Sequence, residues 1–448
     1  MRNLRVAVVG AGPAGIYAAD ILTKSQTPVT VDLIERLPAP FGLVRYGVAP
    51  DHPRIKEIVK ALHRVFENPA IRLLGNVEYG RDIKLDDLRA CYDAVIFSTG
   101  ADSDRALDIP GIALPGSFGA ADFVSWYDGH PDVPRTWPLT ARDVAVIGAG
   151  NVALDVARIL AKTGEELGST EIPDNVRQCL DANQATDVHV FARRGPAHLK
   201  FTPLELRELI HSPNVDVVVH PEGFDVDEHG QAAIRASKQT KQVVDILQNW
   251  VVRDEAPTKP HRIHLHFMQQ PVEVLGDDAV SGLRTERTEL DADGAVVGTG
   301  EYTDWPVGAV YRAVGYLGSA LTDLPFDQRA GVVPNEAGRI LDLDGEPMPG
   351  LYATGWIKRD PVGLIGHTKS DASETVRCLL ADAEALTRPA DSDPDSLTRY
   401  LAGRGVEFTT WQGWQLLDAH ELALGEVEGR LRVKLVPRGD MLRVSRQS

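Results

Sequence analysis

Two glycine-rich segments of the 448-residue sequence have the spacing of a turn that holds the phosphates of a nucleotide. The first, residues 10–15, reads Gly-Ala-Gly-Pro-Ala-Gly and directly follows the largely apolar run 4–9. Gly10 permits a tight turn, Gly12 lets the backbone approach a pyrophosphate, and Gly15 lets the following helix pack closely on the strand. The N–H groups and the dipole of that helix then face the phosphates. We therefore expect a dinucleotide site at the start of the chain.

The end of the next strand predicts what this first segment binds. The largely apolar run 29–34 ends at Glu35, 20 residues beyond Gly15. A carboxylate at this place accepts hydrogen bonds from a ribose diol. Strand, glycine turn, helix, strand and acid follow one another in the order that the complete dinucleotide fingerprint requires.

A second glycine-rich segment lies in mid-chain. Residues 148–153 read Gly-Ala-Gly-Asn-Val-Ala and follow the apolar run 144–147. The next apolar run, 188–192, ends at Arg193 and Arg194 rather than at an acid, after a polar insertion. Arginine at this place suits the 2′-phosphate of NADP. The alternative is a pair of surface arginines without a ligand.

Two fingerprints in one chain are typical of a flavin oxidoreductase, in which one site holds FAD and the other a nicotinamide dinucleotide. Three apolar stretches that run into a glycine support this reading, at residues 97–100, 313–316 and 353–356. A glycine there lets the backbone turn beside a ligand or cross between domains, although each one alone is equally compatible with an ordinary turn.

These elements predict an α/β fold with two Rossmann-like dinucleotide-binding domains. The length suits three typical domains or two enlarged ones. We expect the FAD-binding domain to take residues 1–104, to be interrupted by an NADP-binding domain at residues 105–321, and to resume with a C-terminal tail at residues 322–448. Proline- and glycine-containing stretches at 109–111 and 324–326 are candidate crossings.

Composition and charge exclude several classes of protein. The net charge of −17 argues against nucleic-acid binding, and no 18-residue apolar window predicts a membrane span. Cys91, Cys179 and Cys378 include no Cys-x-x-Cys pair, which excludes thioredoxin-reductase-like chemistry and favours reduced thiols in a cytoplasmic protein. His264 and His266 alternate along one expected strand, but no nearby cysteine or acid completes a site, so we expect no metal.

One long motif carries a family resemblance. Residues 41–53 read Phe-Gly-Leu-Val-Arg-Tyr-Gly-Val-Ala-Pro-Asp-His-Pro. With this motif the chain resembles the adrenodoxin reductase-like NADPH–ferredoxin reductases, including the mycobacterial type. The match continues along nearly the whole chain, at residues 75–77, 150–158, 193–196, 201–202, 205–209, 355–359 and 363. The resemblance implies binding of FAD and NADPH and one-electron delivery to a ferredoxin-like iron–sulfur protein, which would supply a downstream oxidase such as a cytochrome P450.

The resemblance also implies roles for individual residues. With the first turn (Gly10, Gly12, Pro13, Ala14 and Gly15), the FAD contacts would be Glu35, Leu43, Val77, Trp356, Gly363, Leu364 and Ile365. The NADP contacts would be Ala149, Gly150, Asn151, Val152, Arg193, Arg194, Glu205 and Gly363. His52 and Glu208 match two polar residues near the flavin and nicotinamide, and are the candidate catalytic residues. The sequence departs from the family pattern at Ala149, Asp360, Val362 and His367.

Two other functions remain compatible with the sequence. One is a flavin reductase whose acceptor is oxygen, a quinone or a dye. The other is a nucleotide-binding module without turnover, against which the complete first fingerprint argues. His52 just before a helix expected at residues 53–66 is compatible with a capping role, and Glu208 with a solvated acidic face.

An acidic ferredoxin would be repelled by a protein of net charge −17 unless a local basic patch guides it. Candidates lie on the expected helix 53–66 and in the second domain. They are Arg54, Lys56, Lys60, Arg64, Arg207, Lys238 and Lys241. The alternative is that these are ordinary solvated side chains.

Overall fold

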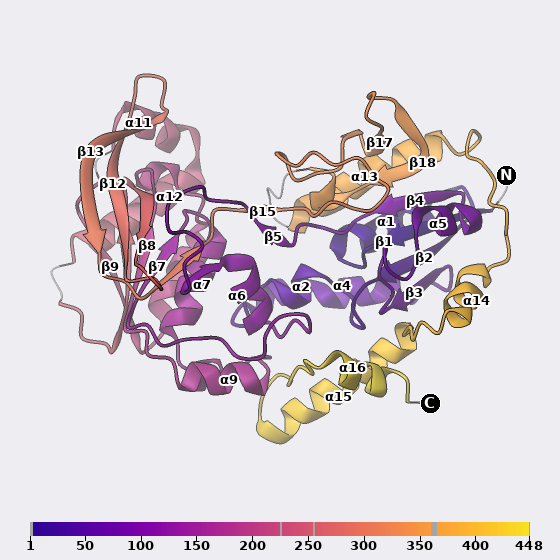
Figure 1. Ribbon diagram of the computed structural model, residues 1–448, viewed down its shortest axis with the longest axis horizontal. Coiled ribbons are helices and arrows are strands. Elements are labelled where there is room, and N and C mark those ends of the chain that lie inside the picture. The colour runs from indigo at the N-terminus through magenta and orange to yellow at the C-terminus, as the bar shows by residue number, and fades with distance from the viewer. Residues whose placement is uncertain (1–2, 225, 254–255, 360–364, 448) are drawn as a thin grey trace. The chain divides into compact units, whose positions relative to one another are not determined.

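The computed structural model describes residues 3–224, 226–253, 256–359 and 365–447, and the chain forms two compact units (Figure 1). The first unit comprises residues 1–103, 128–131 and 316–448. The second comprises residues 104–127 and 132–315 and is inserted into the first. The domain limits expected from the sequence, 104 and 321, lie one and six residues beyond the corresponding limits of the units.

The first unit is built on a seven-stranded sheet. Its strands are β1 (Leu4–Val9), β2 (Val29–Glu35), β3 (Ile71–Gly75), β4 (Ala94–Phe97), β16 (Asn335–Glu336), β17 (Arg339–Leu341) and β18 (Pro347–Ala353). Their spatial order is β16-β17-β18-β4-β1-β2-β3. The strands from β18 to β3 pair in parallel, and β17 and β16 add an antiparallel edge. The neighbouring strands β1 and β2 are the runs predicted around the first glycine turn.

The helices of this unit cover both faces of the sheet. They are α1 (Pro13–Thr23), α2 (Leu43–Tyr46), α3 (Pro53–Lys56), α4 (Ile58–Val65), α5 (Leu85–Cys91), the 3₁₀ turn η3 (Gly355–Ile357), α13 (Ile365–Ala381), α14 (Ser396–Gly403), α15 (Trp411–Glu428) and α16 (Arg438–Ser445). The helix expected over residues 53–66 is interrupted at Glu57. There the carbonyl of Glu57 accepts a hydrogen bond from Lys60 N, three residues on, instead of continuing the α-helical pattern.

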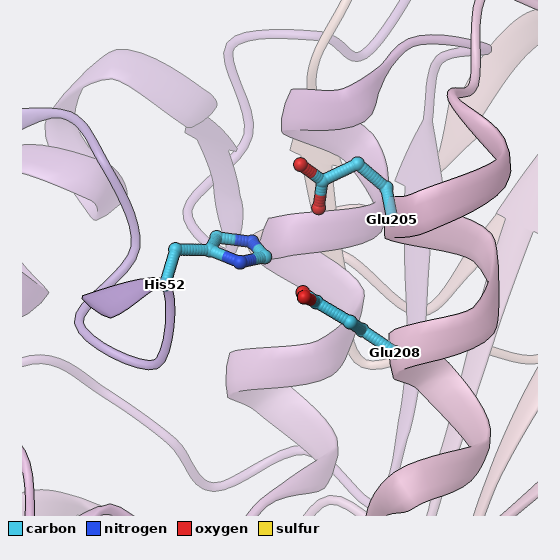
Figure 2. Close-up of side chains that lie close together, drawn as sticks. All are labelled: His52, Glu205 and Glu208. Atoms are coloured by element: carbon cyan, nitrogen blue, oxygen red, sulfur yellow. The ribbon is translucent and has the colours of Figure 1, made fainter. Parts of the chain in front are cut away.

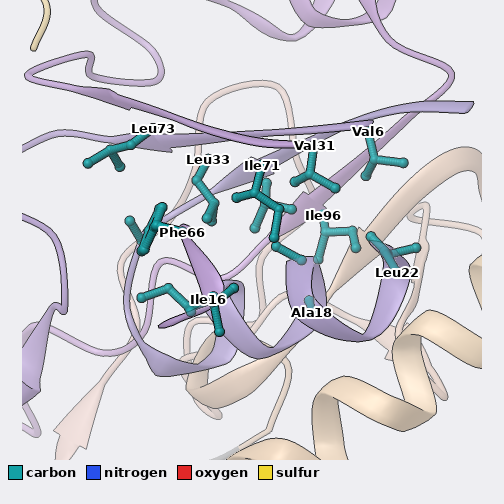
Figure 3. Packing of buried hydrophobic residues seen from close by; sticks show 14 of the residues in the cluster. Val6, Ile16, Ala18, Leu22, Val31, Leu33, Phe66, Ile71, Leu73 and Ile96 are labelled. Atoms are coloured by element: carbon teal, nitrogen blue, oxygen red, sulfur yellow. The ribbon is translucent and has the colours of Figure 1, made fainter. Parts of the chain in front are cut away.

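The side chains of β1 point alternately to the two faces of the sheet, and each face carries its own layer of the core. Val6 and Val8 face a cluster that includes Ile16 of α1 and Leu33 of β2 (Figure 3). Ala7 and Val9 face a second cluster, which includes residues of α5 and α14. Residues 6–9 of β1 are buried on both faces of the sheet, which explains why all four are apolar, whereas Arg5 near the amino end of the strand is a buried charge.

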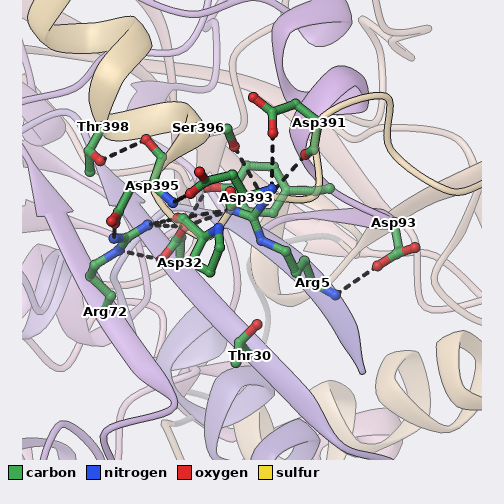
Figure 4. A network of polar contacts seen from close by, with 12 residues as sticks. Arg5, Thr30, Asp32, Arg72, Asp93, Asp391, Asp393, Asp395, Ser396 and Thr398 are labelled. Carbon is green, nitrogen blue, oxygen red and sulfur yellow. Dashed lines mark hydrogen bonds and ion pairs between the residues drawn. The ribbon is translucent and has the colours of Figure 1, made fainter. Parts of the chain in front are cut away.

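A polar network fastens residues 391–396 to the amino ends of the strands (Figure 4). Arg5 Nη1 donates to the carbonyl of Asp393 at 2.6 Å. Arg72 donates to both carboxylate oxygens of Asp32 and, at 2.8 Å, to Asp395. A cavity of about 500 Å³ lies beside these side chains. Because nucleotides bind at the carboxyl ends of parallel strands, this cavity is at the wrong edge of the sheet for a dinucleotide.

The second unit contains a six-stranded parallel sheet and a three-stranded antiparallel one. The parallel strands, in the spatial order β6-β14-β7-β8-β10-β9, are β6 (Ser117–Gly119), β14 (Ala309–Arg312), β7 (Asp143–Ile147), β8 (Asp187–Phe191), β10 (His261–His266) and β9 (Val215–Val219). The antiparallel strands are β11 (Gln269–Leu275), β12 (Gly282–Leu290) and β13 (Val296–Trp305). Two short strands, β5 (Ser103–Asp104) and β15 (Tyr316–Leu317), pair where the chain passes between the units.

The helices of the second unit are α6 (Ala120–Tyr127), α7 (Asn151–Ala161), α8 (Gly164–Leu167), α9 (Asp174–Asp181), α10 (Pro203–Glu208), α11 (Glu228–Ala236) and α12 (Lys238–Val251), with 3₁₀ turns η1 (Pro196–His198) and η2 (Leu209–His211). Helix α7 packs on β7, β8 and β10. The opposite face carries an apolar cluster that includes Phe191 and, from the antiparallel sheet, Val274 and Leu283. Two units with parallel sheets, each with a glycine turn between strand and helix, confirm the predicted fold class. No helix of the described residues is long and apolar enough to cross a membrane.

Candidate functional site

The first glycine turn lies at the carboxyl end of β1, where two of its glycines are required by packing. Gly10 has a φ of +109°, and a Cβ there would lie 2.5 Å from the carbonyl oxygen of Ser98. A Cβ on Gly15 would collide with the carbonyl oxygen of Gly10. Ser98 belongs to the predicted strand end 97–100, and its Oγ donates to the Gly10 carbonyl at 2.8 Å. The turn and this strand end therefore fix each other's position.

Packing within the protein does not require a glycine at position 12. A Cβ on Gly12 would meet nothing closer than the Cα of Gly42, at 3.9 Å. Gly12 is the N-cap of α1, Pro13 follows it, and no side chain among the described residues caps this helix. The first turn of α1, with Ala14, thus presents backbone N–H groups at a place with room for an anion. This geometry fits the pyrophosphate of a dinucleotide.

Glu35 ends β2 with its carboxylate buried beside the turn. Its Oε2 accepts a hydrogen bond from Ala11 N at 2.9 Å, and its Oε1 accepts one from Leu37 N at 3.0 Å. Burial raises the pKa of Glu35, and these backbone donors oppose the rise. Because each carboxylate oxygen can accept a second hydrogen bond, the side chain that fixes the turn keeps capacity for a ribose hydroxyl.

The other residues expected to contact FAD lie near the carboxyl edge of the same sheet. Leu43 opens α2, Val77 is buried and donates its N–H to the Glu35 carbonyl at 2.9 Å, and Trp356 is half-buried in η3. Gly355 has a φ of +76°, and a Cβ there would lie 2.7 Å from the Cβ of Ala14, so the strand end 353–356 reaches the first turn of α1. Of the remaining candidates, Gly363 and Leu364 lie outside the described residues, as does the side chain of Ile365.

Asp371 of α13 is a site residue that the sequence analysis missed. Its Oδ2 accepts hydrogen bonds from Thr354 Oγ1 at 2.9 Å and from Gly355 N at 2.6 Å. Its Oδ1 lies 3.0 Å from Lys358 Nζ. One buried carboxylate therefore fixes the turn that carries Trp356. The aspartate lies 16 residues after Gly355, so no local motif marks the link.

The second glycine turn repeats the pattern of the first. A Cβ on Gly148 would collide with the carbonyl oxygen of Ala313, whereas a Cβ on Gly150 would meet nothing within 4 Å. Gly150 is the N-cap of α7 and, among the described side chains, none caps it. Asn151 Oδ1 accepts a hydrogen bond from Thr202 N at 3.0 Å, and the Ala149 carbonyl accepts one from Lys200 N at 2.8 Å. The space at Gly150 fits a second pyrophosphate, with Val152 in the first turn of α7.

Arg193 and Arg194 follow β8 at the carboxyl edge of the second sheet. Arg193 is exposed and Arg194 is half-buried. Within the described residues the structure records no ion pair or side-chain hydrogen bond for either guanidinium. The chain beneath them is fixed, because Thr288 Oγ1 donates to the Arg193 carbonyl at 2.9 Å. A cavity of about 300 Å³ opens directly beyond them, lined by residues 195–198 and 287–290 among others. Two available cations at this position fit a phosphate.

Helix α10 carries Glu205 and Glu208, which project from the same side of the helix (Figure 2). Thr202 caps the helix, accepting a hydrogen bond from Glu205 N at 3.2 Å. Glu205 is 5% exposed, and its Oε2 lies 3.9 Å from Nη1 of the buried Arg158. Arg158 Nη2 also donates to Asp155 at 2.8 Å. Arg158 is thus a buried charge beside Glu205, a pairing between α7 and α10 that only the structure shows.

His52 lies in the first unit, at the N-cap of α3 (Figure 2). It is 4% exposed, and its carbonyl accepts backbone hydrogen bonds from Ile55 and Lys56. Its side chain makes no capping hydrogen bond with α3, so the capping alternative for the imidazole receives no support within the described residues.

The residues proposed for a basic patch differ in their availability. Lys56 is not a surface charge, because its side chain is 9% exposed and Nζ lies 3.3 Å from the buried Asp128 Oδ1. Arg54 and Arg64 are exposed. Lys60 is also exposed, but its Nζ lies 3.1 Å from Glu57 Oε1. In the second unit the exposed candidates are Arg207, Lys238 and Lys241.

The histidines of the second sheet form hydrogen-bonded pairs. His189 Nδ1 lies 3.1 Å from His266 Nε2, and His220 Nε2 lies 3.2 Å from His264 Nδ1. His264 Nε2 also lies 2.9 Å from Asp187. The pairs stack on each other, with centroids 4.5 Å apart for His189 and His264 and 4.4 Å apart for His220 and His266. Among these described side chains, three ligand atoms do not converge on one point.

Comparison with known proteins places this architecture in a family. The pyridine nucleotide-disulphide oxidoreductase family matches residues 4–246. NADPH-ferredoxin reductase FprA of Mycobacterium tuberculosis is 41% identical over 462 aligned positions, which cover 99% of each chain. The mitochondrial NADPH:adrenodoxin oxidoreductase of Arabidopsis thaliana is 38% identical, over 98% of this chain and 95% of that one.

A solved structure agrees with the sequence comparison. The structure of Mycobacterium tuberculosis FprA in complex with NADPH superposes with a TM-score of 0.91 at 40% identity, covering 99% of this chain and all of the other. The chain therefore belongs to the pyridine nucleotide-disulphide oxidoreductase family and, within it, to the adrenodoxin reductase-like NADPH–ferredoxin reductases.

Proposed function

We propose that the protein is an FAD-dependent oxidoreductase that takes a hydride from NADPH and passes single electrons to a ferredoxin-like iron–sulfur protein. The observation that carries this proposal is the pair of glycine turns with open space at Gly12 and Gly150, one beside Glu35 and the other before a strand that ends in two available arginines. FAD, when bound, supplies the ability to accept two electrons together and release them one at a time.

The first unit would hold FAD through elements that already fix one another. The turn at residues 10–15 would bind the pyrophosphate through the N–H groups of α1, and Glu35 would accept the ribose hydroxyls. Leu43, Val77 and Trp356 would contact the cofactor from three further segments. Gly363, Leu364 and Ile365, which the family resemblance adds, are part of the same proposal.

The second unit would bind the pyrophosphate of NADPH in the same way, but arginines instead of a carboxylate would contact the ribose and its phosphate. The turn at Gly150 would hold the pyrophosphate, with Ala149, Asn151 and Val152 around it. Arg193 and Arg194 would bind the 2′-phosphate with charge-assisted hydrogen bonds. Glu205, buried beside Arg158, would be a further contact to NADP.

His52 and Glu208 would be the polar groups closest to the chemistry. The support for His52 is a buried imidazole without a capping bond to its own helix, and for Glu208 a half-buried carboxylate on the same side of α10 as Glu205. His52→Gln and Glu208→Gln keep side-chain size and remove the titrating group. We expect both to change the pH profile of NADPH-dependent flavin reduction while FAD content stays unchanged.

The acceptor follows from the relatives, which are named for ferredoxin and adrenodoxin. A reduced iron–sulfur protein would in turn supply an oxidase such as a cytochrome P450. We place the protein in the cytoplasm, because its cysteines Cys91, Cys179 and Cys378 are all free thiols.

The cofactor and the reductant are tested together on the purified protein. The chromophore released by heat should be FAD, and the flavin absorbance should bleach with NADPH much faster than with NADH. Release of FMN, or a colourless protein after reconstitution with FAD, would refute the proposal. Bleaching followed by reoxidation by oxygen, quinone or dye, without transfer to any ferredoxin, would favour the alternative flavin reductase.

A further inference from the structure

A buried ion pair joins the segment after the first glycine turn to the C-terminal part of the chain. Arg45 lies in α2, and Glu421 lies in α15, 376 residues further along. The guanidinium donates two hydrogen bonds to the carboxylate, from Nη1 at 3.0 Å and from Nη2 at 2.6 Å. The side chains are 5% and 0% exposed. Burying two charges carries a large desolvation cost, so the position of this pair needs an explanation.

The residues that lead into helix α2 pack directly against the glycine turn of the first unit. Phe41 N donates to the Ala11 carbonyl at 2.8 Å. Gly42 has a φ of +49°, and a Cβ there would lie only 3.2 Å from the Cα of Gly12. Gly12 is the glycine in front of which a pyrophosphate has room. A shift of α2 would therefore change the wall of the proposed FAD site at its phosphate-binding point.

Helix α2 is too short to hold its own position. It has four residues, and Gly42 and Gly47 flank it. Its orientation is set instead by Arg45, whose guanidinium lies 5.2 Å from the ring centroid of Trp414 in α15. The Arg45 carbonyl also accepts a hydrogen bond from the buried Lys434 Nζ at 2.8 Å. Both the side chain and the backbone of Arg45 are thus held by the C-terminal segment.

Glu421 is itself held in one position. Its Oε1 accepts a hydrogen bond from Leu435 N at 2.9 Å, and its Oε2 accepts one from Arg432 Nη1 at 3.2 Å. Burial lowers the pKa of Arg45, but the charges and hydrogen bonds of Glu421 and Tyr46 together outweigh burial and raise that pKa well above its ordinary value. The guanidinium of Arg45 therefore remains charged, and the bidentate geometry of the pair fixes direction as well as distance.

We propose that Glu421 is a positioning residue for FAD: through Arg45 it fixes α2 and the turn at residues 41–42 against the glycine turn that receives the pyrophosphate. The C-terminal helix α15 is then part of the cofactor-binding apparatus, although it contributes no dinucleotide motif. This inference rests on the proposed function, in which FAD is the ligand of the first turn. A pair with a merely structural role would fasten α15 without influencing the flavin.

The test is Glu421→Gln, which keeps the shape of the side chain and removes its charge. FAD is titrated into the apoprotein, and the bound flavin is examined by visible absorbance and circular dichroism. We expect the dissociation constant for FAD to rise about tenfold and the visible spectrum of the bound flavin to change. Glu426→Gln is the matched control, because Glu426 is exposed on the same helix, and it should behave as wild type.

A second variant separates positioning from folding. The double substitution Arg45→Met/Glu421→Leu replaces the ion pair by apolar side chains, which can preserve stability but cannot reproduce the bidentate hydrogen bonds. It should unfold at the wild-type temperature and still bind FAD weakly. Wild-type FAD affinity and spectrum in either folded variant would overturn the inference, as would failure of both to fold. A wild-type protein that binds no FAD would refute the proposed function instead.

Discussion

Replacing Arg193 and Arg194 by alanine should remove the preference of the protein for NADPH over NADH. Both side chains follow β8, at the edge of the sheet where the second glycine turn lies, and neither has a carboxylate partner among the described residues. They are therefore available to a 2′-phosphate without first breaking an ion pair. Such a phosphate should bind them through charge-assisted hydrogen bonds.

The size of the effect follows from these contacts. One charge-assisted hydrogen bond contributes about 1.5–3 kcal/mol, which corresponds to about 10- to 150-fold in affinity. Arg193 is exposed, so its loss should lie at the low end, and the half-buried Arg194 should contribute more. Because adjacent residues that bind one group are not independent, the double variant should lose less than the product of the single losses.

The assay is steady-state reduction of a dye with NADPH and with NADH. Each single variant should raise the KM for NADPH with little change in kcat, since the phosphate is bound equally in the ground and transition states. The NADH constants should barely change. Arg142→Ala is the matched control, because this exposed arginine precedes β7 at the opposite edge of the same sheet. A double variant that keeps its full NADPH preference would show that the phosphate is bound elsewhere.

Three further predictions follow from the geometry. Gly12→Ala should leave the unfolding temperature unchanged and weaken FAD binding. Gly15→Ala should lower the unfolding temperature, because only the Cβ at position 15 collides with backbone. Equal unfolding temperatures for the two variants would contradict this prediction. Burial lowers the pKa of His189 to about 4, so the folded protein resists a proton that the unfolded chain accepts near pH 6.5. Stability in urea should therefore fall by about 1.4 kcal/mol per pH unit for this group between pH 6.5 and 4, and His189→Gln should flatten that slope while the exposed His420→Gln should not. Reduction of a ferredoxin should slow as salt shortens the Debye length below about 10 Å, whereas reduction of a neutral quinone should not slow. Salt-independent ferredoxin reduction would exclude electrostatic guidance by exposed residues such as Arg207 and Lys238.

The local parts of the fold could be predicted because neighbouring residues determine them. The run 4–9 is β1 with unchanged bounds, because its residues 6–9 are buried on both faces of the sheet and are all apolar. Gly10 and Gly15 were assigned by spacing, and the structure supplies the collisions that make them obligatory. The interruption at Glu57 was not predictable, because the apolar stripe of residues 53–66 continues across it.

The missed residues all act over long distances in the sequence. Asp371 fixes Gly355 from another helix, Arg158 is buried only where α7 meets α10, and Arg45 meets Glu421 across most of the chain. Composition and periodicity report which face of an element is apolar, but not which buried charge finds which partner. For Arg45 and Arg158 the available signal was that each lies inside a motif quoted for the family.

Passage of electrons from NADPH through the flavin to an iron–sulfur protein can be followed by anaerobic rapid mixing. The flavin-loaded protein is mixed with NADPH and with an oxidised ferredoxin, and the flavin and iron–sulfur absorbances are followed together. We expect the flavin to bleach first and two ferredoxins then to be reduced for each NADPH consumed, because each ferredoxin accepts one electron. A flavin that bleaches while every ferredoxin tested stays oxidised, and that recovers only when oxygen or a quinone is admitted, would contradict it.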